Sequence, residues 1–273
     1  MTSRVADTQP HLRGTPYIQS ISRAAFVLRL IGNLPETGAA FSDIQRLSML
    51  PRATVHRLLK SLKNEGFVLQ DVKTRRYQVG PLIYELGLVA RSLAPNLDEC
   101  QDIIDAASLN AGTCVSVLCR SGDDVLCIRR SAWSQKETTP GDVGIRRPIG
   151  VGAGGVAILA MQKEEEREAI IQRQSDLYKS YGALETDTVR RAVELTLSRG
   201  FAVRPFGVLH RGVGVAVPTK TSPVSLAVRS GPVSINLPRS EIRRIACQLT
   251  KAAAKVAEVV DSGLQIKTER RLH

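Results

Sequence analysis

The sequence lacks the features that mark several common classes of protein. None of its apolar runs approaches the roughly 20 residues that a membrane-spanning helix needs. Residues 1–16 carry charges, prolines and a glycine but no apolar core, so they match neither a signal peptide nor a membrane anchor. We therefore expect residues 1–16 to form a disordered tail, and the protein to be cytoplasmic without a membrane partner.

Motifs for metal binding and for catalysis are missing as well. The five cysteines form no C-x-x-C pair, and their odd number in a chain without a signal peptide indicates reduced thiols. No Ser-His-Asp set or carboxylate pair stands beside a candidate pocket, so we expect no catalytic residue, no metal and no cofactor. Each cysteine is interpreted as a small packing residue, with a redox sensor as the alternative. The cysteines are Cys100, Cys114, Cys119, Cys127 and Cys247.

Acidic residues are outnumbered by basic ones, and unevenly so. The 273 residues carry a formal net charge of +12, and 43% of them are hydrophobic, which is enough for the cores of two domains. Residues 1–95 hold 13 Lys and Arg against 6 Asp and Glu, while the remaining residues hold 25 against 20. The positive charge is therefore densest in the first third, as contact with phosphates requires.

One short basic helix is predicted in that first third. Val55, Leu58, Leu59 and Leu62 fall at i, i+3, i+4 and i+7, which gives one buried stripe. Proline suits the first turn of such a helix, and a glycine follows where it should stop. The opposite face carries Arg52, Thr54, His56, Arg57, Lys60 and Lys63.

The flanking residues predict a winged helix-turn-helix. Ser42 and Gln45 form a capping box that would start a helix over 43–47, about three residues before the basic helix. Strands over 67–70 and 77–79 would enclose a basic tip, and an earlier helix over 20–31 would begin with a capping Ser20. The basic face favours insertion into the major groove of DNA; a merely solvated face is the alternative, and Arg23 could equally bind phosphate, water or an acid.

Two further parts are predicted after the wing. An apolar helix over 82–94 would link the domains and expose an apolar side that could pack against a partner. The rest alternates helices and β-rich runs, which predicts an α+β sensory domain with helices on the faces of an antiparallel sheet. We predict domains at 17–80, 81–95 and 96–262 and a charged tail at 263–273. The helices are expected at 98–110, 164–174, 187–198 and 238–260, and the strands at 113–120, 124–130, 200–204, 212–218 and 224–229.

A glycine-rich turn precedes an apolar helix expected over 156–160. Gly150, Gly152 and Gly155 satisfy the spacing of a dinucleotide fingerprint, but the preceding arginines and the missing acid after a second strand argue against one. Two interpretations stay open. The glycines permit a tight turn, or the backbone N–H groups of residues 152–155 bind a small anion at the helix N-terminus.

These motifs resemble the IclR-type bacterial transcription regulators over residues 18–260. The resemblance rests on Leu50-Pro51-x-x-Thr54-Val55-His56-Arg57-Leu58-Leu59, on Gly66-Phe67-Val68 and on Tyr77-Gln78-Val79-Gly80-Pro81. It continues in Arg147-Pro148-x-Gly150-x-Gly152-Ala153-Gly154-Gly155, Arg199-Gly200-Phe201-Ala202-Val203 and Val215-Ala216-Val217-Pro218. Two places depart from the pattern: Arg204-Pro205-Phe206 replaces acidic residues, and the loop at Arg211-Gly212-Val213-Gly214 is one residue short.

The resemblance implies a winged helix-turn-helix, a dimerising linker helix and a GAF-like α+β effector domain, assembled as a homodimer or a dimer of dimers. It implies double-stranded DNA with a pseudo-palindromic operator as partner, and a small organic or aromatic acid as effector. The DNA-binding residues expected are Ser22, Arg23, Ser42, Arg52, Ala53, Thr54, His56, Arg57, Lys60, Lys63, Lys73, Arg75 and Arg76. The effector-binding residues expected are Asp142, Gly152, Ala153, Gly154, Gly155, Val215, Ala216, Val228 and Ser230.

The leading hypothesis is thus an effector-controlled, sequence-specific DNA-binding regulator that is not an enzyme. The alternative is a small-molecule sensor or enzyme whose basic N-terminal domain serves oligomerisation, which predicts turnover of a ligand and weak, sequence-blind DNA affinity. A structural DNA-coating protein is a third option, but it gives the large α+β domain no purpose.

Overall fold

The computed structural model describes residues 18–34, 37–90, 97–131, 143–182, 184–204, 210–217, 226–230, 233–234 and 238–269. The chain divides into two compact units, Met1–Leu93 and Ala94–His273. The tail predicted at residues 1–16 lies outside the described residues.

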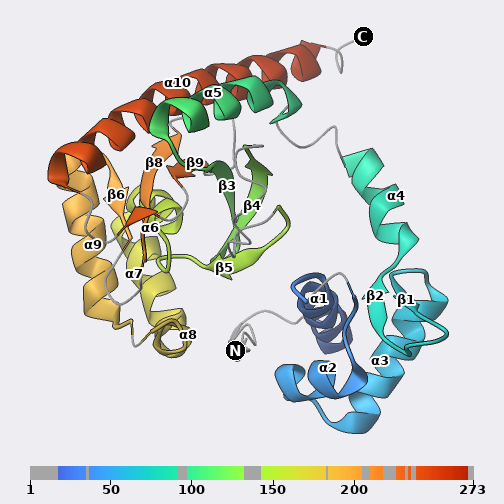
Figure 1. Cartoon of the computed structure of the whole chain (residues 1–273). Coiled ribbons are helices and arrows are strands. Elements are labelled where there is room, and N and C mark those ends of the chain that lie inside the picture. The colour runs from blue at the N-terminus through green and yellow to red at the C-terminus, as the bar shows by residue number, and fades with distance from the viewer. Residues whose placement is uncertain are drawn as a thin grey trace. The chain divides into compact units, whose positions relative to one another are not determined.

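Three helices and a hairpin form the core of the first unit, which also contains the helix α4, Pro81–Ala90 (Figure 1). Its hairpin strands are antiparallel, with Val68 opposite Val79, and an isolated bridge joins Ala39 to Tyr77. The helices bury one apolar stripe each around a common core, in which Ile44 and Val55 are completely buried. The elements are α1 Gln19–Gly32, α2 Phe41–Ser48, α3 Arg52–Asn64, β1 Val68–Gln70 and β2 Tyr77–Val79.

The serines predicted to cap helices do not do so. α1 begins at Gln19 after Ile18 and α2 begins at Phe41 after Ala40, and no described side chain caps either helix. Ser42 is an exposed residue within the first turn of α2. The capping box is wrong because Phe41 packs on the core, and packing of an apolar residue decides where a short helix starts more strongly than a single cap does.

The predicted linker helix is α4, Pro81–Ala90. It starts at Pro81. A proline suits the first helical position because the N–H that it lacks would have no hydrogen-bond partner within the helix. Its apolar side chains are largely exposed, with Tyr84 at 71%, Leu88 at 53% and Val89 at 77% of full exposure. Residues 91–94 of the predicted helix lie outside the described residues.

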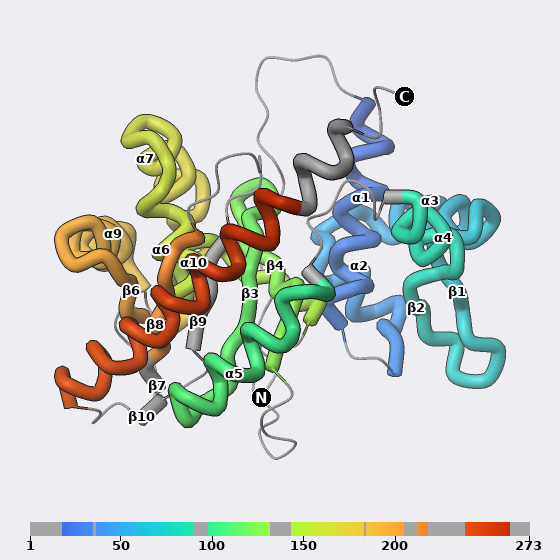
Figure 2. The backbone as a smooth tube through the Cα atoms, turned by 90° about the horizontal axis from the view of Figure 1, so that it is seen from above, coloured from blue at the N-terminus to red at the C-terminus, as the bar shows by residue number. Residues whose placement is uncertain are grey.

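The second unit is built on a six-stranded sheet in the order β5-β4-β3-β9-β8-β6, with every neighbouring pair antiparallel. Figures 1 and 2 show α5 and α10 together on one face of this sheet and α6 on the other, with α7 and α9 behind it. The predicted α+β class is therefore confirmed. The strands are β3 Val115–Ser121, β4 Asp124–Arg130, β5 Arg146–Pro148, β6 Ala202–Val203, β8 Val213–Val217 and β9 Leu226–Ser230, with β7 His210–Arg211 and β10 Val233–Ser234 as a separate pair.

Two cores fill this unit, one on each side of the sheet. Val115, Val117 and Val215 pack against α5 and α10, whereas Leu118, Val125 and Cys127 pack against the α6 layer. This alternation follows from the period of two along a strand. The helices are η2 Leu97–Cys100, α5 Gln101–Ala111, α6 Ala153–Ala160, α7 Glu164–Arg173, α8 Ser175–Lys179, α9 Thr186–Arg199 and α10 Arg239–Glu269.

Some boundaries differ from the prediction. α10 continues to Glu269, beyond the predicted end at residue 260, so residues 263–269 of the predicted charged tail are helical. A single glycine such as Gly263 weakens a helix by only about 1 kcal/mol, so the helix continues through it. The strand β5 and the short helix α8 were not predicted, since neither has a clear apolar period of its own.

Candidate DNA-binding face and effector site

α3 presents the basic face that the sequence predicts. Val55, Leu59 and Leu62 are buried and Leu58 is half-buried, so the stripe at i, i+3, i+4 and i+7 faces the core. Pro51 is the N-cap residue with φ −55°, and the helix starts directly after it. The side chains on the other side are exposed at Arg52, Ala53, His56, Arg57, Lys60 and Lys63, and Thr54 is half-buried.

The turn between α2 and α3 is tight and locally bonded. Met49 ends α2 in the left-handed conformation, with φ 54°, and its side chain is 71% exposed. The buried Ser48 hydroxyl donates to the carbonyl of Gln45 at 3.2 Å and accepts from the N–H of Leu50 at 3.4 Å. The turn therefore fixes the angle at which α3 leaves α2, as a helix-turn-helix requires.

An aromatic contact holds the first residue of α3. The guanidinium carbon of Arg52 lies 5.0 Å from the centre of the Phe41 ring, which is the distance of a cation–π contact. Phe41 is half-buried and rests on the core of the first unit. Sequence reasoning did not include Phe41, because 11 positions separate it from Arg52 and only the fold brings the two together.

The wing separates three basic residues that the sequence grouped together. Lys73 and Arg75 are exposed at the tip, where Asp71 accepts hydrogen bonds from the backbone N–H of Thr74 at 2.5 Å and from its hydroxyl at 2.7 Å. These bonds lower the pKa of Asp71. Arg76, in contrast, is half-buried and donates from Nη1 to the carbonyl of Gly38 at 2.8 Å. Its guanidinium anchors the wing to the segment before α2, so we remove Arg76 from the groove-contacting set.

Ser22 and Arg23 lie half-buried on the first turns of α1. Ser42 is exposed on α2, where Arg46 and Asp43 form a surface ion pair of 3.2 Å. An exposed ion pair of this kind contributes little to stability. The neighbouring Ser42 therefore remains accessible to a partner.

In the second unit, the glycine-rich turn opens α6 earlier than the sequence predicts. Gly152 is the N-cap residue and Ala153, Gly154 and Gly155 form the first turn, all three of them buried. The N-cap glycine has no side chain, and no described side chain caps this helix. The first N–H groups of α6 therefore lie in a turn whose residues have the smallest side chains. Such a turn leaves room for an anion to bind the backbone.

β8 approaches this turn closely. A Cβ added at Gly214 would lie 2.6 Å from the carbonyl carbon and oxygen of Ala153 and 2.7 Å from the nitrogen of Gly154. The glycine is thus required for direct backbone packing of β8 against α6. Within the glycine-rich turn itself, Gly150 has φ +98°, and a Cβ added at Gly155 would lie 3.0 Å from the nitrogen of Gly150, so these two glycines permit the tight turn.

The strand alternation sorts the predicted effector residues by face. Val215 packs in the core beside α5 and α10, with its side chain away from α6, so we leave it out of the candidate site. Ala216 lies on the α6 side. Val228 is opposite Val215, and Ser230 is opposite Val115. The side chains of Val228 and Ser230, and all of Asp142, lie outside the described residues.

Ser116 is a candidate that sequence reasoning missed. It is completely buried in β3, and its hydroxyl has no hydrogen-bond partner among the described residues. Because Val115 and Val117 face α5 and α10, Ser116 faces the α6 side. Ser116 is opposite Arg229, which is in turn opposite Gly214. A polar residue inside the apolar run of residues 115–118 was the available signal.

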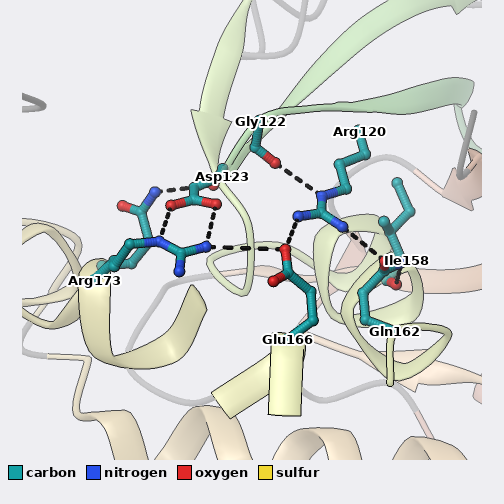
Figure 3. A network of polar contacts seen from close by, with 8 residues as sticks. Arg120, Gly122, Asp123, Ile158, Gln162, Glu166 and Arg173 are labelled. Carbon is teal, nitrogen blue, oxygen red and sulfur yellow. Dashed lines mark hydrogen bonds and ion pairs between the residues drawn. The ribbon is translucent and has the colours of Figure 1, made fainter. Parts of the chain in front are cut away.

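A polar network ties the β3–β4 hairpin to α7 and to Gln162, two residues after the end of α6 (Figure 3). Arg120 donates to Gln162 at 2.7 Å and pairs with Glu166. Arg173 binds both carboxylate oxygens of Asp123, at 2.7 and 2.9 Å, and its Nη2 lies 3.9 Å from Glu166. The two arginines and two acids balance in charge, so this network holds elements together and does not attract an anion.

The cysteines are free thiols. Cys100, Cys114 and Cys127 are buried, and burial raises the pKa of Cys100 to about 11, which agrees with a packing role. Cys119 is half-buried and Cys247 is exposed. Among the residues that the structure describes, no cluster of His, Cys, Asp and Glu has the arrangement of a metal site. No helix in the described part of the chain is both long and apolar enough to cross a membrane.

Comparison with known proteins agrees with this architecture. Residues 20–72 match the IclR helix-turn-helix domain. The glycerol operon regulatory protein of Streptomyces griseus is 30% identical over 194 residues, which cover 68% of this chain and 72% of that protein. The chain belongs to the IclR family of transcriptional regulators. This membership identifies it as a DNA-binding regulator and decides against the enzyme alternative.

Other members extend the comparison. The regulator TtgV of Pseudomonas putida is 27% identical over 157 residues, covering 58% of this chain and 60% of TtgV. An IclR family regulator from Brucella abortus superimposes with a TM-score of 0.71 at 19% identity, over 95% of this chain and 99% of that one. An IclR homologue from Microbacterium hydrocarbonoxydans, solved in complex with 4-hydroxybenzoate, gives 0.64 at 19% identity, over 89% and 99%. At these identities the two structures support the fold alone.

Proposed function

We propose that this IclR regulator inserts α3 into the major groove of a pseudo-palindromic operator and that a small organic acid controls its binding. The observation that carries the DNA part is the exposed basic face of α3 opposite a fully apolar back. In a helix-turn-helix the N-terminal residues of the second helix contact base edges. We assign that role to Arg52, Ala53, Thr54, His56 and Arg57.

The remaining basic residues position the protein. Lys60 and Lys63 lie further along α3, where phosphates flank the groove, and Lys73 and Arg75 extend from the wing tip. Ser22, Arg23 and Ser42 are suited to hydrogen bonds with the DNA backbone. Phosphate contacts of this kind give affinity without reading the sequence, whereas base contacts give specificity.

The exposed apolar side chains of α4 support a second copy of the chain as partner. Tyr84, Leu86, Leu88 and Val89 are each at least half exposed, which is a costly arrangement for a lone helix. A twofold axis along α4 would bring two recognition helices to two half-sites, and the symmetry of the operator would follow that of the dimer. Either a dimer or a dimer of dimers satisfies this requirement.

An acid is the effector class that the second unit favours. The N-terminus of α6 attracts negative charge through its first N–H groups, which have no partner among the described residues, and through the helix dipole. The buried Ser116 hydroxyl lacks a partner among the described residues, and a bound ligand would satisfy it. The complex of the Microbacterium homologue with 4-hydroxybenzoate supports an aromatic acid. The proposed site comprises Gly152, Ala153, Gly154, Gly155 and Ala216, with Ser116 added.

Control follows from differential binding. An effector that binds one arrangement of the two DNA-binding units more tightly shifts the population towards it and changes the spacing of the α3 helices. A ligand with equal affinity for both arrangements would change nothing.

The first experiment is selection of bound sequences from random duplex DNA by the full chain at about 0.15 M salt, where non-specific phosphate binding is weak. We expect an enriched inverted repeat. Arg57→Ala should abolish the enrichment, whereas Arg243→Ala, which removes an exposed charge from α10, should preserve it. Equal salt-sensitive binding to all sequences would contradict the reading role of α3.

The effector assignment has its own test. Thermal unfolding of the full chain is measured with 4-hydroxybenzoate and with the uncharged 4-hydroxybenzamide. A hundredfold excess over the dissociation constant stabilises by about 2.7 kcal/mol, so binding of the acid should raise the unfolding temperature clearly. Ser116→Ala should reduce the shift, while Ser198→Ala, on the exposed side of α9, should not. An equal shift with the amide would exclude an anion site.

A further inference from the structure

The stacking of Arg52 on Phe41 has a bearing on base recognition. Arg52 is the first residue of α3, where a recognition helix meets base edges. Its guanidinium carbon lies 5.0 Å from the centre of the Phe41 ring. This distance is within the range of a cation–π contact, so the ring attracts the guanidinium.

Nothing else in the described part of the chain occupies those N–H groups. No described carboxylate or carbonyl accepts a hydrogen bond from Arg52, although Arg46, Arg76 and Arg120 each bind protein acceptors. Arg52 is exposed, whereas the ring beneath it is half-buried against the core. The ring is thus held by packing, and its attraction favours one position of the arginine guanidinium.

Such an arrangement matches one ligand in particular. The planar fork of a guanidinium fits the O6 and N7 acceptors of guanine in the major groove, and this pairing is the commonest specific contact of arginine with a base. An unrestrained arginine loses much side-chain freedom on ordering, and a preset orientation reduces that loss.

We propose that Phe41 is a positioning residue that holds Arg52 for two-point recognition of a guanine in each operator half-site. The inference rests on the proposed insertion of α3 into the major groove. It adds a base identity and a residue of α2 that does not itself need to touch DNA.

The test is selection from random duplex DNA with a matched set of variants of the full chain. Arg52→Ala should remove the preference for guanine at one position of the half-site. Phe41→Leu, which keeps an apolar side chain on the core but removes the ring, should weaken the preference at that same position by roughly two- to fivefold. Phe41→Tyr keeps the ring and should behave like the unmodified protein.

Two controls separate positioning from a loss of stability. Phe67 is also half-buried against the same core, but the structure places no described guanidinium over its ring. Phe67→Leu should therefore leave the guanine preference unchanged. In an Arg52→Ala background, Phe41→Leu should add no further loss at the guanine position. Should Phe41→Leu prove unfolded in a thermal scan, Phe41→Met replaces it.

The outcomes are distinct. Loss confined to the Arg52 position, with none in the Phe67 control, supports the inference. An unchanged guanine preference in Phe41→Leu, or equal losses at all positions, overturns it. Failure of the unmodified protein to enrich any sequence would overturn the proposed function as well, and is therefore distinguishable.

Discussion

Gly214→Ala tests whether the backbone of β8 rests directly on the first turn of α6. The added Cβ would lie 2.6 Å from the carbonyl carbon and oxygen of Ala153 and 2.7 Å from the nitrogen of Gly154. Contacts this short do not occur between unstrained atoms, and all three atoms belong to the backbone of a buried helix. No side chain can rotate to relieve the contact, so the strand or the helix has to move.

The size of the effect follows from the cost of overpacking. An extra group forced into a well-packed core costs about 1–3 kcal/mol. For a unit of this size, each kcal/mol lowers the unfolding temperature by about 2–4 °C. We therefore expect Gly214→Ala to lower the unfolding temperature of the second unit by roughly 2–12 °C.

Differential scanning calorimetry of the full chain is the appropriate assay, with Gly152→Ala as the control. Gly152 has φ −119°, and a Cβ built on it would meet no atom within 4 Å. Alanine is a slightly poorer N-cap than glycine, but it also lowers the entropy of the unfolded chain. These two effects on the free energy of unfolding should offset each other to within about 0.5 kcal/mol. If Gly214→Ala is as stable as Gly152→Ala, the close approach of β8 to α6 does not exist.

Further predictions concern single contacts. Arg75→Ala should lower the slope of log affinity for DNA against log salt by about 1, whereas Arg76→Ala should leave the slope unchanged and destabilise the first unit. The slopes are measured by fluorescence anisotropy at several salt concentrations, and an equal fall in both would contradict the prediction. Arg190 lowers the pKa of Glu168 from 4.5 to about 2, so its stabilising effect is complete above pH 4.5 and is lost as the pH falls towards 2. The difference in unfolding temperature between the unmodified protein and Glu168→Gln should therefore shrink over that range, and a constant difference would refute the pairing. Tyr178→Phe should cost about 1–3 kcal/mol in a denaturant titration, because the buried hydroxyl donates a 2.8 Å bond to a carbonyl that would be left unpaired.

The sequence predicted those features that depend on local periodicity. The stripe of α3 is real because Val55, Leu59 and Leu62 share a helix face whatever the rest of the chain does. The helix over 187–198 and the strand over 124–130 were confirmed as α9 and β4 for the same reason. The predicted first residues of the helices were wrong because a helix start depends on packing, as the position of Phe41 shows.

The contacts between distant residues were beyond local reasoning. The bond from Arg76 to Gly38 spans 38 positions, so the sequence grouped Arg76 with the wing tip by charge alone. The face of Val215 depends on the register of β8 within the sheet, and a shift of one residue would reverse it. Ser116 was overlooked because a buried serine is unusual only once its surroundings are known.

The contact of β8 with α6 also determines how stiff this part of the domain is. Side chains that separate two elements act as soft spacers, because their rotamers absorb small displacements. No side chain stands between Gly214 and the first turn of α6. A displacement of that turn therefore cannot be absorbed by a change of rotamer between the two backbones. We therefore expect the start of α6 and β8 to move together, so that a displacement of one by a fraction of an ångström displaces the other by a similar amount.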